Sequence, residues 1–107
     1  MANIFMSEEA IQDLEQIGDY IAHQFKNHKS ALNTIRKIQE RINQLEDFPL
    51  TGIPLSAIVA TQTDYRFLGC GSYLAFYRPK NGDVLIDRIL HGRQDYASIL
   101  LGDIQEG

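Results

Sequence analysis

The stretch from residue 84 to residue 96, VLIDRILHGRQDY, constrains the fold of this chain more than any other. Its first seven residues form an apolar run of strand length. Strict alternation gives the strand two faces: Val84, Ile86, Arg88 and Leu90 on one, and Leu85, Asp87, Ile89 and His91 on the other. Both faces are largely apolar and must be buried against other parts of the protein, so the strand is predicted to be central in a sheet. It ends by presenting His91 and Arg93 around Gly92, a combination suited to binding an anion or to catalysis.

Two segments with helical periodicity come earlier in the chain. Apolar residues recur every three or four positions from about Ser7 to Lys26, and again from about Ser30 to Glu46. Phe25 is predicted to be the last member of the first apolar stripe. Ser7 is a favourable N-cap for the first helix, and the second must end before Pro49. The short polar break between the two segments predicts an antiparallel helical hairpin.

The remaining segments supply the predicted sheet. Asn3–Met6 is predicted to be an edge strand, and residues 50–63, which have no clear period, a loop. Glycine-containing turns separate three β-prone segments, and Asn81-Gly82 is a strong hairpin signal. These segments form a predicted three-stranded antiparallel meander: Tyr65–Leu68, Tyr73–Arg78 and Val84–His91. Residues 94–102 are predicted to form a short closing helix.

The sequence therefore predicts an α+β fold over residues 1–107 as a single domain. An N-terminal helical hairpin should pack on a small twisted antiparallel sheet, with a short C-terminal helix. No apolar run is long enough to cross a membrane, no signal peptide is recognisable, and Cys70 is the single cysteine. We therefore expect a cytoplasmic protein without a cofactor or a metal.

The charge of the chain is unevenly distributed. The net charge is −4, which argues against broad non-specific binding of nucleic acid. Residues 7–47 carry five basic and eight acidic side chains, whereas residues 64–93 carry five basic and three acidic ones. An anionic partner is therefore expected to bind the second half of the chain.

Several short motifs follow one another along nearly the whole chain: Ser7–Ala10, Asp19–Ile21, Phe48–Pro49, Tyr65–Arg66, Gly71–Arg78 and Arg88–Asp95. In their order and spacing the chain resembles the ParE/RelE superfamily of toxins from bacterial type II toxin–antitoxin systems. The long helical hairpin and the HGRQD stretch look closer to ParE than to RelE.

The resemblance implies a growth-inhibiting toxin, of the kind involved in plasmid stabilisation, that is neutralised by a cognate antitoxin protein. ParE-like members inhibit DNA gyrase, and this is the preferred interpretation. RelE-like members are ribosome-dependent endoribonucleases that cleave mRNA, which is the second interpretation. A third is an inactive protein with the toxin fold that only binds the antitoxin.

The endoribonuclease interpretation makes the chain a metal-independent enzyme with a defined set of residues. Such an enzyme needs a base, an acid and cations for the charge that develops on the phosphate. His91 would act as base or acid, and Arg93 and Arg66 would hold the phosphate. Tyr73 or Tyr96 would stack on a base of the mRNA.

Departures from the RelE pattern favour the gyrase interpretation. RelE-like toxins carry Lys-x-Lys where this chain reads Arg66-Phe67-Leu68, and an arginine where it has Leu74. Their tyrosine in the closing helix falls near Leu100 here, so Tyr96 is only an approximate substitute. The acidic chain also lacks the basic surface that favours binding to the ribosome.

Purely structural roles remain open for the same residues. His91 would then hydrogen-bond at the end of its strand, and Arg93 would pair with Asp95. Arg88, on a mostly apolar face, is expected to pair with a buried carboxylate. Cys70 has no neighbour that would lower its pKa, and it is predicted to be non-catalytic.

Overall fold

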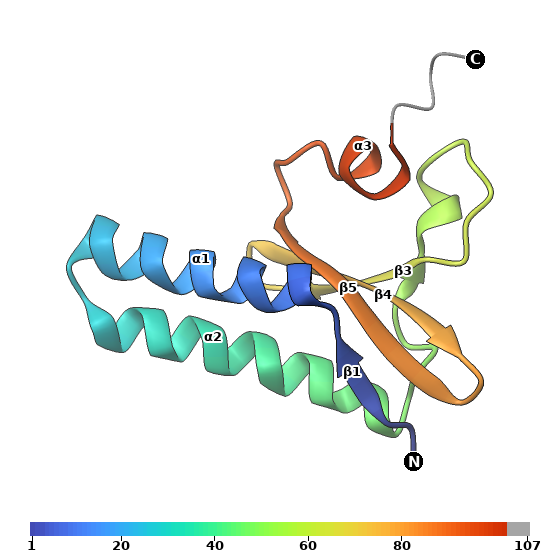
Figure 1. Cartoon of the computed structure of the whole chain (residues 1–107), viewed down its shortest axis with the longest axis horizontal. Helices are drawn as coiled ribbons and strands as arrows, with labels where there is room; N and C mark the ends of the chain where they lie inside the picture. The colour runs from blue at the N-terminus through green and yellow to red at the C-terminus, as the bar shows by residue number, and fades with distance from the viewer. Residues whose placement is uncertain (103–107) are drawn as a thin grey trace.

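The structure, a computed structural model, describes residues 1–102 of the chain. It has the predicted α+β architecture, with a long helical hairpin, a twisted sheet and a short helix near the end (Figure 1). The elements follow one another in this order: β1 (Ile4–Met6), α1 (Glu8–Phe25), α2 (His28–Asn43), η1 (Gln44–Glu46), β2 (Ile53–Pro54), η2 (Leu55–Ala57), β3 (Arg66–Cys70), β4 (Tyr73–Lys80), β5 (Asp83–His91) and α3 (Tyr96–Leu101).

The five strands form one mixed sheet in the order β1-β5-β4-β3-β2. The prediction that β5 is central is confirmed, because it lies between β1 and β4. The meander β3-β4-β5 is antiparallel as predicted, whereas β1 pairs with β5 in parallel. Residues 50–63, expected to be a loop, include the two-residue strand β2 and the short turn η2.

Capping residues define the helical hairpin. The Ser7 hydroxyl accepts a hydrogen bond from the Ala10 amide, and the Asn27 side chain accepts one from the Ser30 amide. Lys26, at φ 50°, adopts the left-handed conformation that ends α1 and turns the chain into α2. The apolar stripes of both helices pack on one face of the sheet and form the main core.

A bulge changes the faces of β5. Phe76 pairs with Arg88 and Tyr77 with Ile86, so that Asp87 is the additional residue on β5. The prediction of strict alternation is therefore wrong beyond Ile86. Ile89 joins Val84 and Ile86 in the main core, whereas Leu90 joins a smaller core on the opposite face of the sheet. Residues from η2 and α3, including Leu55 and Tyr96, belong to that smaller core.

A cluster of three polar side chains lies beside the bulge. Arg78 pairs with Asp87, at 3.0 Å between Nε and Oδ2, and its guanidinium lies 5.1 Å from the centre of the Tyr65 ring. Burial first, and then the hydrogen bond and the negative charge of Asp87, raise the pKa of Tyr65 to about 12. The neutral phenol of Tyr65 is therefore the form that the folded chain favours.

We expect the last tyrosine step of an alkaline titration to disappear in Tyr65→Phe. The stabilisation from neutral Tyr65 is complete below pH 10.0, the ordinary pKa of the phenol, and is lost as the pH rises toward about 12. Ultraviolet absorbance of tyrosinate during alkaline titration measures this step. Tyr20→Phe is the control and should retain the late step, whereas a Tyr65→Phe curve that also retains it would contradict the assignment.

Candidate functional site

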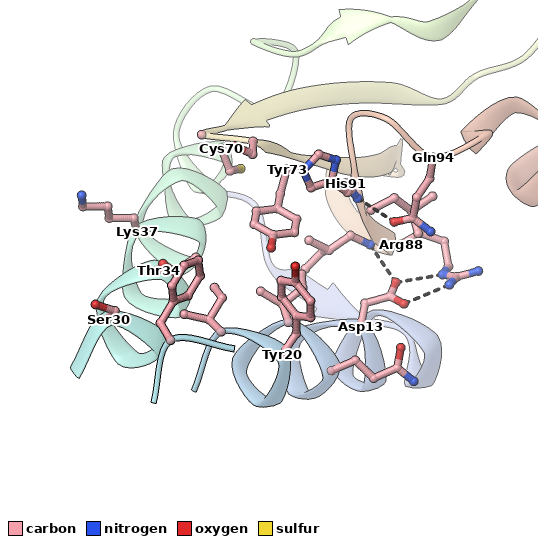
Figure 2. Close-up of a pocket in the computed structure, with 18 residues that line it drawn as sticks. Asp13, Tyr20, Ser30, Thr34, Lys37, Cys70, Tyr73, Arg88, His91 and Gln94 are labelled. Carbon is pink, nitrogen blue, oxygen red and sulfur yellow. Dashed lines mark hydrogen bonds and ion pairs between the residues drawn. The ribbon is translucent and has the colours of Figure 1, made fainter. Parts of the chain in front are cut away.

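A groove of about 860 Å³, open to solvent, lies between the helical hairpin and the ends of β3, β4 and β5 (Figure 2). Apolar and aromatic side chains line much of it: Ile17, Tyr20, Ile21, Phe25, Tyr73, Ile89 and Leu90. Polar groups at its margins include Gln16, Thr34, Lys37 and Gln94. The groove is therefore an apolar trough with a polar rim, as expected for a surface that binds another macromolecule.

The groove exists because the helical hairpin projects past the sheet (Figure 1). Tyr20 and Phe25, near the end of α1, keep 59% and 66% of their surface exposed. The helical periodicity predicts that Phe25 belongs to the apolar stripe of α1 that packs in the core. That prediction is wrong, because no strand lies under the last turn of the helix. Figure 2 shows Tyr20 and Tyr73 pointing toward one another across the groove.

His91 and Tyr73 lie together at one end of the groove. They are opposite each other on β5 and β4, and their rings meet edge to face with centroids 5.4 Å apart. His91 Nδ1 accepts a hydrogen bond from the Arg93 amide at 3.1 Å. A neutral imidazole that accepts at Nδ1 carries its proton on Nε2. The expected hydrogen bond of His91 at the strand end is thus confirmed, and Nε2 is the nitrogen left for a partner.

Arg93 follows on the turn after β5, and its side chain is exposed. The suggested pair with Asp95 is not formed within residues 1–102. Asp95 instead caps α3, where it accepts hydrogen bonds from the amide and the hydroxyl of Ser98. Arg93 therefore presents its guanidinium to solvent beside His91.

Arg66 and Tyr96, the other two predicted site residues, lie elsewhere. The Arg66 guanidinium donates to the carbonyls of Gly52, at 2.7 Å, and Leu50, at 3.2 Å. Arg66 is the first residue of β3, whereas Tyr73 pairs with the last residue of that strand. Arg66 and Tyr73 are therefore at opposite ends of β3. Tyr96 lies on the opposite face of the sheet and packs on Phe76, with ring centroids 5.2 Å apart. The structure thus brings His91 and Tyr73 together in the groove, with Arg93 two residues further along the chain and outside the groove lining. Arg66 and Tyr96 are separated from them.

Arg88 has the predicted carboxylate partner. Its Nε and Nη2 donate to the two oxygens of Asp13 on α1, at 2.8 and 2.9 Å. Asp13 is buried, and it also accepts a hydrogen bond from the Ile89 amide at 2.9 Å. The hydrogen bond that Arg88 donates to Asp13 raises the pKa of Arg88. This guanidinium is therefore occupied in joining α1 to β5.

The remaining groups of the groove give no sign of covalent or metal chemistry. Burial raises the pKa of the Cys70 thiol, which keeps it protonated and fits the non-catalytic interpretation. Within the described part of the chain, no three His, Cys, Asp or Glu side chains gather as metal ligands would. No helix among residues 1–102 is long and apolar enough to cross a bilayer.

Comparison with known proteins places these features in context. A family model described as the ParE toxin of the type II toxin–antitoxin system parDE matches residues 4–96. A solved structure of the chromosomal ParDE system from P. aeruginosa is similar at 22% identity and a TM-score of 0.72, over 85% of this chain and 96% of that one. YafQ from E. coli strain BL21(DE3) is similar at 13% identity and a TM-score of 0.46, over 86% and 94%. No curated protein matches the chain.

Proposed function

The chain belongs to the ParE toxin family of type II toxin–antitoxin systems, and from this premise we propose that it stops growth by inhibiting DNA gyrase. Inhibition would occur in the cytoplasm through protein contact and would need no cofactor. A cognate antitoxin protein would neutralise it. Cleavage of mRNA is the function that this proposal has to exclude.

One observation carries the proposal: the residues required for RNA cleavage do not converge. The Arg66 guanidinium is held by two backbone carbonyls, and Tyr96 packs on the far face of the sheet. A phosphoryl transition state needs several cations aimed at one set of oxygens. Arg88 cannot replace the missing cation without leaving Asp13 unpaired.

The groove supports the antitoxin part of the proposal. Exposed aromatic side chains such as Tyr20 and Phe25 are costly to leave in water, and a partner's apolar residues would cover them. An amphipathic helix presents such residues along one face and fits a trough of this kind. The antitoxin is therefore expected to supply an apolar segment to the groove between the hairpin and the sheet.

Two assays run in parallel test the target. Chain made by cell-free translation is added to gyrase with relaxed plasmid, and separately to ribosomes translating a defined mRNA. We expect loss of supercoiling with intact mRNA, because no assembled cleavage site is available. Arg93→Ala should leave mRNA intact as the parent does, and Arg36→Ala, which removes another exposed arginine, serves as the matched control.

Other outcomes would reject the gyrase proposal. Site-specific mRNA breaks that disappear in Arg93→Ala would establish the endoribonuclease, which the exposed Arg93 beside His91 favours. If neither assay responds and induction without antitoxin leaves growth unchanged, the chain is an inactive antitoxin-binding protein.

A further inference from the structure

The chain protects most of the sheet's edge backbone with its own side chains. At the β2 edge, the strand has only two residues and the second is Pro54. Beyond β2, the exposed carbonyl of Gly69 on β3 accepts a hydrogen bond from Arg41 Nε at 3.0 Å. On β5, past the end of β1, the Asp13 carboxylate accepts a hydrogen bond from the Ile89 amide, and the Ser7 hydroxyl donates one to the Asp87 carbonyl. These contacts leave little backbone open to another strand.

The outer edge of β1 is the exception among the described strands. The Asn3 carbonyl and the Ser7 amide both bond to β5. By the alternation of a strand, the backbone groups of Phe5 face β5 as well, and those of Ile4 and Met6 face outward. The three residues of β1 include no charge and no proline. Apart from its short length, β1 therefore has neither a charge nor a proline to prevent strand pairing.

The side chains beside this edge are apolar on both faces of the sheet. Phe5 keeps 54% of its surface exposed on the face away from the helices. Ile4 and Met6 pack against the main core on the other face. A second groove, of about 550 Å³, runs along β1 between the strand and α2. An added strand would contact Phe5 on one side. On the other side it would contact a groove that polar side chains line together with Ile42: Gln39, Asn43 and Glu46.

We propose that β1 pairs with β1 of a second copy of this chain, antiparallel, about a two-fold axis through Phe5. In this register Ile4 lies opposite Met6 of the second copy, and Met6 opposite its Ile4. The outward-facing backbone groups of each pair then exchange both hydrogen bonds. Phe5 meets Phe5 of the second copy as a non-hydrogen-bonded pair, the arrangement in which side chains come closest. The edge is thus complementary to itself, as a two-fold interface must be.

The pairing joins two five-stranded sheets into one continuous sheet of two copies. Three residues from each copy bury far less than the roughly 1,200 to 2,000 Å² of a stable interface. The dimer is therefore weak and forms as the concentration rises. It does not depend on the target of the toxin, so loss of gyrase inhibition and loss of the dimer are separate results.

A cysteine at the two-fold axis tests the register. Cα atoms of a non-hydrogen-bonded antiparallel pair lie about 4.5 Å apart, within the range of about 4.4 to 6.8 Å that a disulfide spans. In a Cys70→Ala background, Phe5→Cys should form a reducible dimer under mild oxidation. Ile53→Cys is the matched control, because Ile53 is 52% exposed on the other edge of the sheet. Failure of Phe5→Cys to form more dimer than Ile53→Cys overturns the proposal.

Sedimentation over a range of concentrations tests the pairing without a cross-link. Phe5→Glu replaces an aromatic pair by two like charges and should raise the dissociation constant of the dimer about tenfold or more. Ile53→Glu should leave the constant unchanged. A parent chain that remains monomeric at every concentration overturns the proposal, as does a Phe5→Glu chain that associates like the parent. Protection of the Ile4 and Met6 amides from exchange only when another protein is added would assign the edge to that protein and also overturn it.

Discussion

Asp13→Ala is expected to lower the free energy of unfolding by about 3 kcal/mol, the low end for breaking a buried ion pair. The carboxylate satisfies the Arg88 guanidinium and the Ile89 amide at once, and alanine leaves both without a partner. We expect the lower value because 29% of the Arg88 side-chain surface is exposed to solvent. Water can therefore partly hydrate the guanidinium after the carboxylate is removed. Chemical denaturation of the purified chain measures the change.

A double-mutant cycle separates the ion pair from the loss of packing. Arg88→Leu in the Asp13→Ala background removes the stranded charge, so the double variant should be more stable than the sum of the single changes predicts. Asp19→Ala is the matched control on α1, since Asp19 is exposed, and it should change stability by no more than about 0.5 kcal/mol. Equal losses for Asp13→Ala and Asp19→Ala would contradict the role of Asp13.

Gly52→Ala is expected to destabilise the fold by a similar amount, about 3 kcal/mol. A Cβ at position 52 would lie 2.6 Å from the Tyr77 hydroxyl, 2.7 Å from its ring and 2.8 Å from the Phe67 carbonyl. Tyr77 is fully buried and has no room to move. Its hydroxyl also accepts a hydrogen bond from the Gly52 amide and donates one to the Pro49 carbonyl, so a shift would break both.

Gly69→Ala provides the control for this prediction. Nothing lies within 4 Å of a Cβ built at Gly69, and the strand position accepts any side chain. Its thermal unfolding midpoint should stay close to that of the parent, while that of Gly52→Ala falls by several degrees. A midpoint for Gly52→Ala as high as that of Gly69→Ala would show that the loop after η1 yields to the added methyl group.

Local patterns were enough to predict the helical hairpin and the central strand. Ser7 and the apolar stripes have their effect within a few residues, so the sequence near each helix determines it. The hairpin turn at Asn81 and Gly82 is similarly local, with both residues at positive φ. The carboxylate partner of Arg88 was also expected, because a guanidinium on an apolar strand face needs one.

Features that depend on distant segments were not predictable in the same way. No local signal marks the bulge at Asp87, which becomes visible only when β4 and β5 are paired. The exposure of Phe25 depends on where the sheet ends beneath α1. The Arg66 guanidinium is taken up by the backbone of a loop whose path the sequence pattern did not reveal. The candidate site was therefore only partly predicted, because its cations are placed by tertiary contacts.

The parallel pairing of β1 with β5 has a consequence for synthesis. Ile4 pairs with Val84, so β1 leaves the ribosome well before its partner strand β5 has been made. Until then the nascent chain carries two amphipathic helices whose apolar stripes have no sheet to cover. A contact between residues so far apart in the sequence forms slowly and late in folding. The order of synthesis thus delays completion of the toxin fold until β5 has been made.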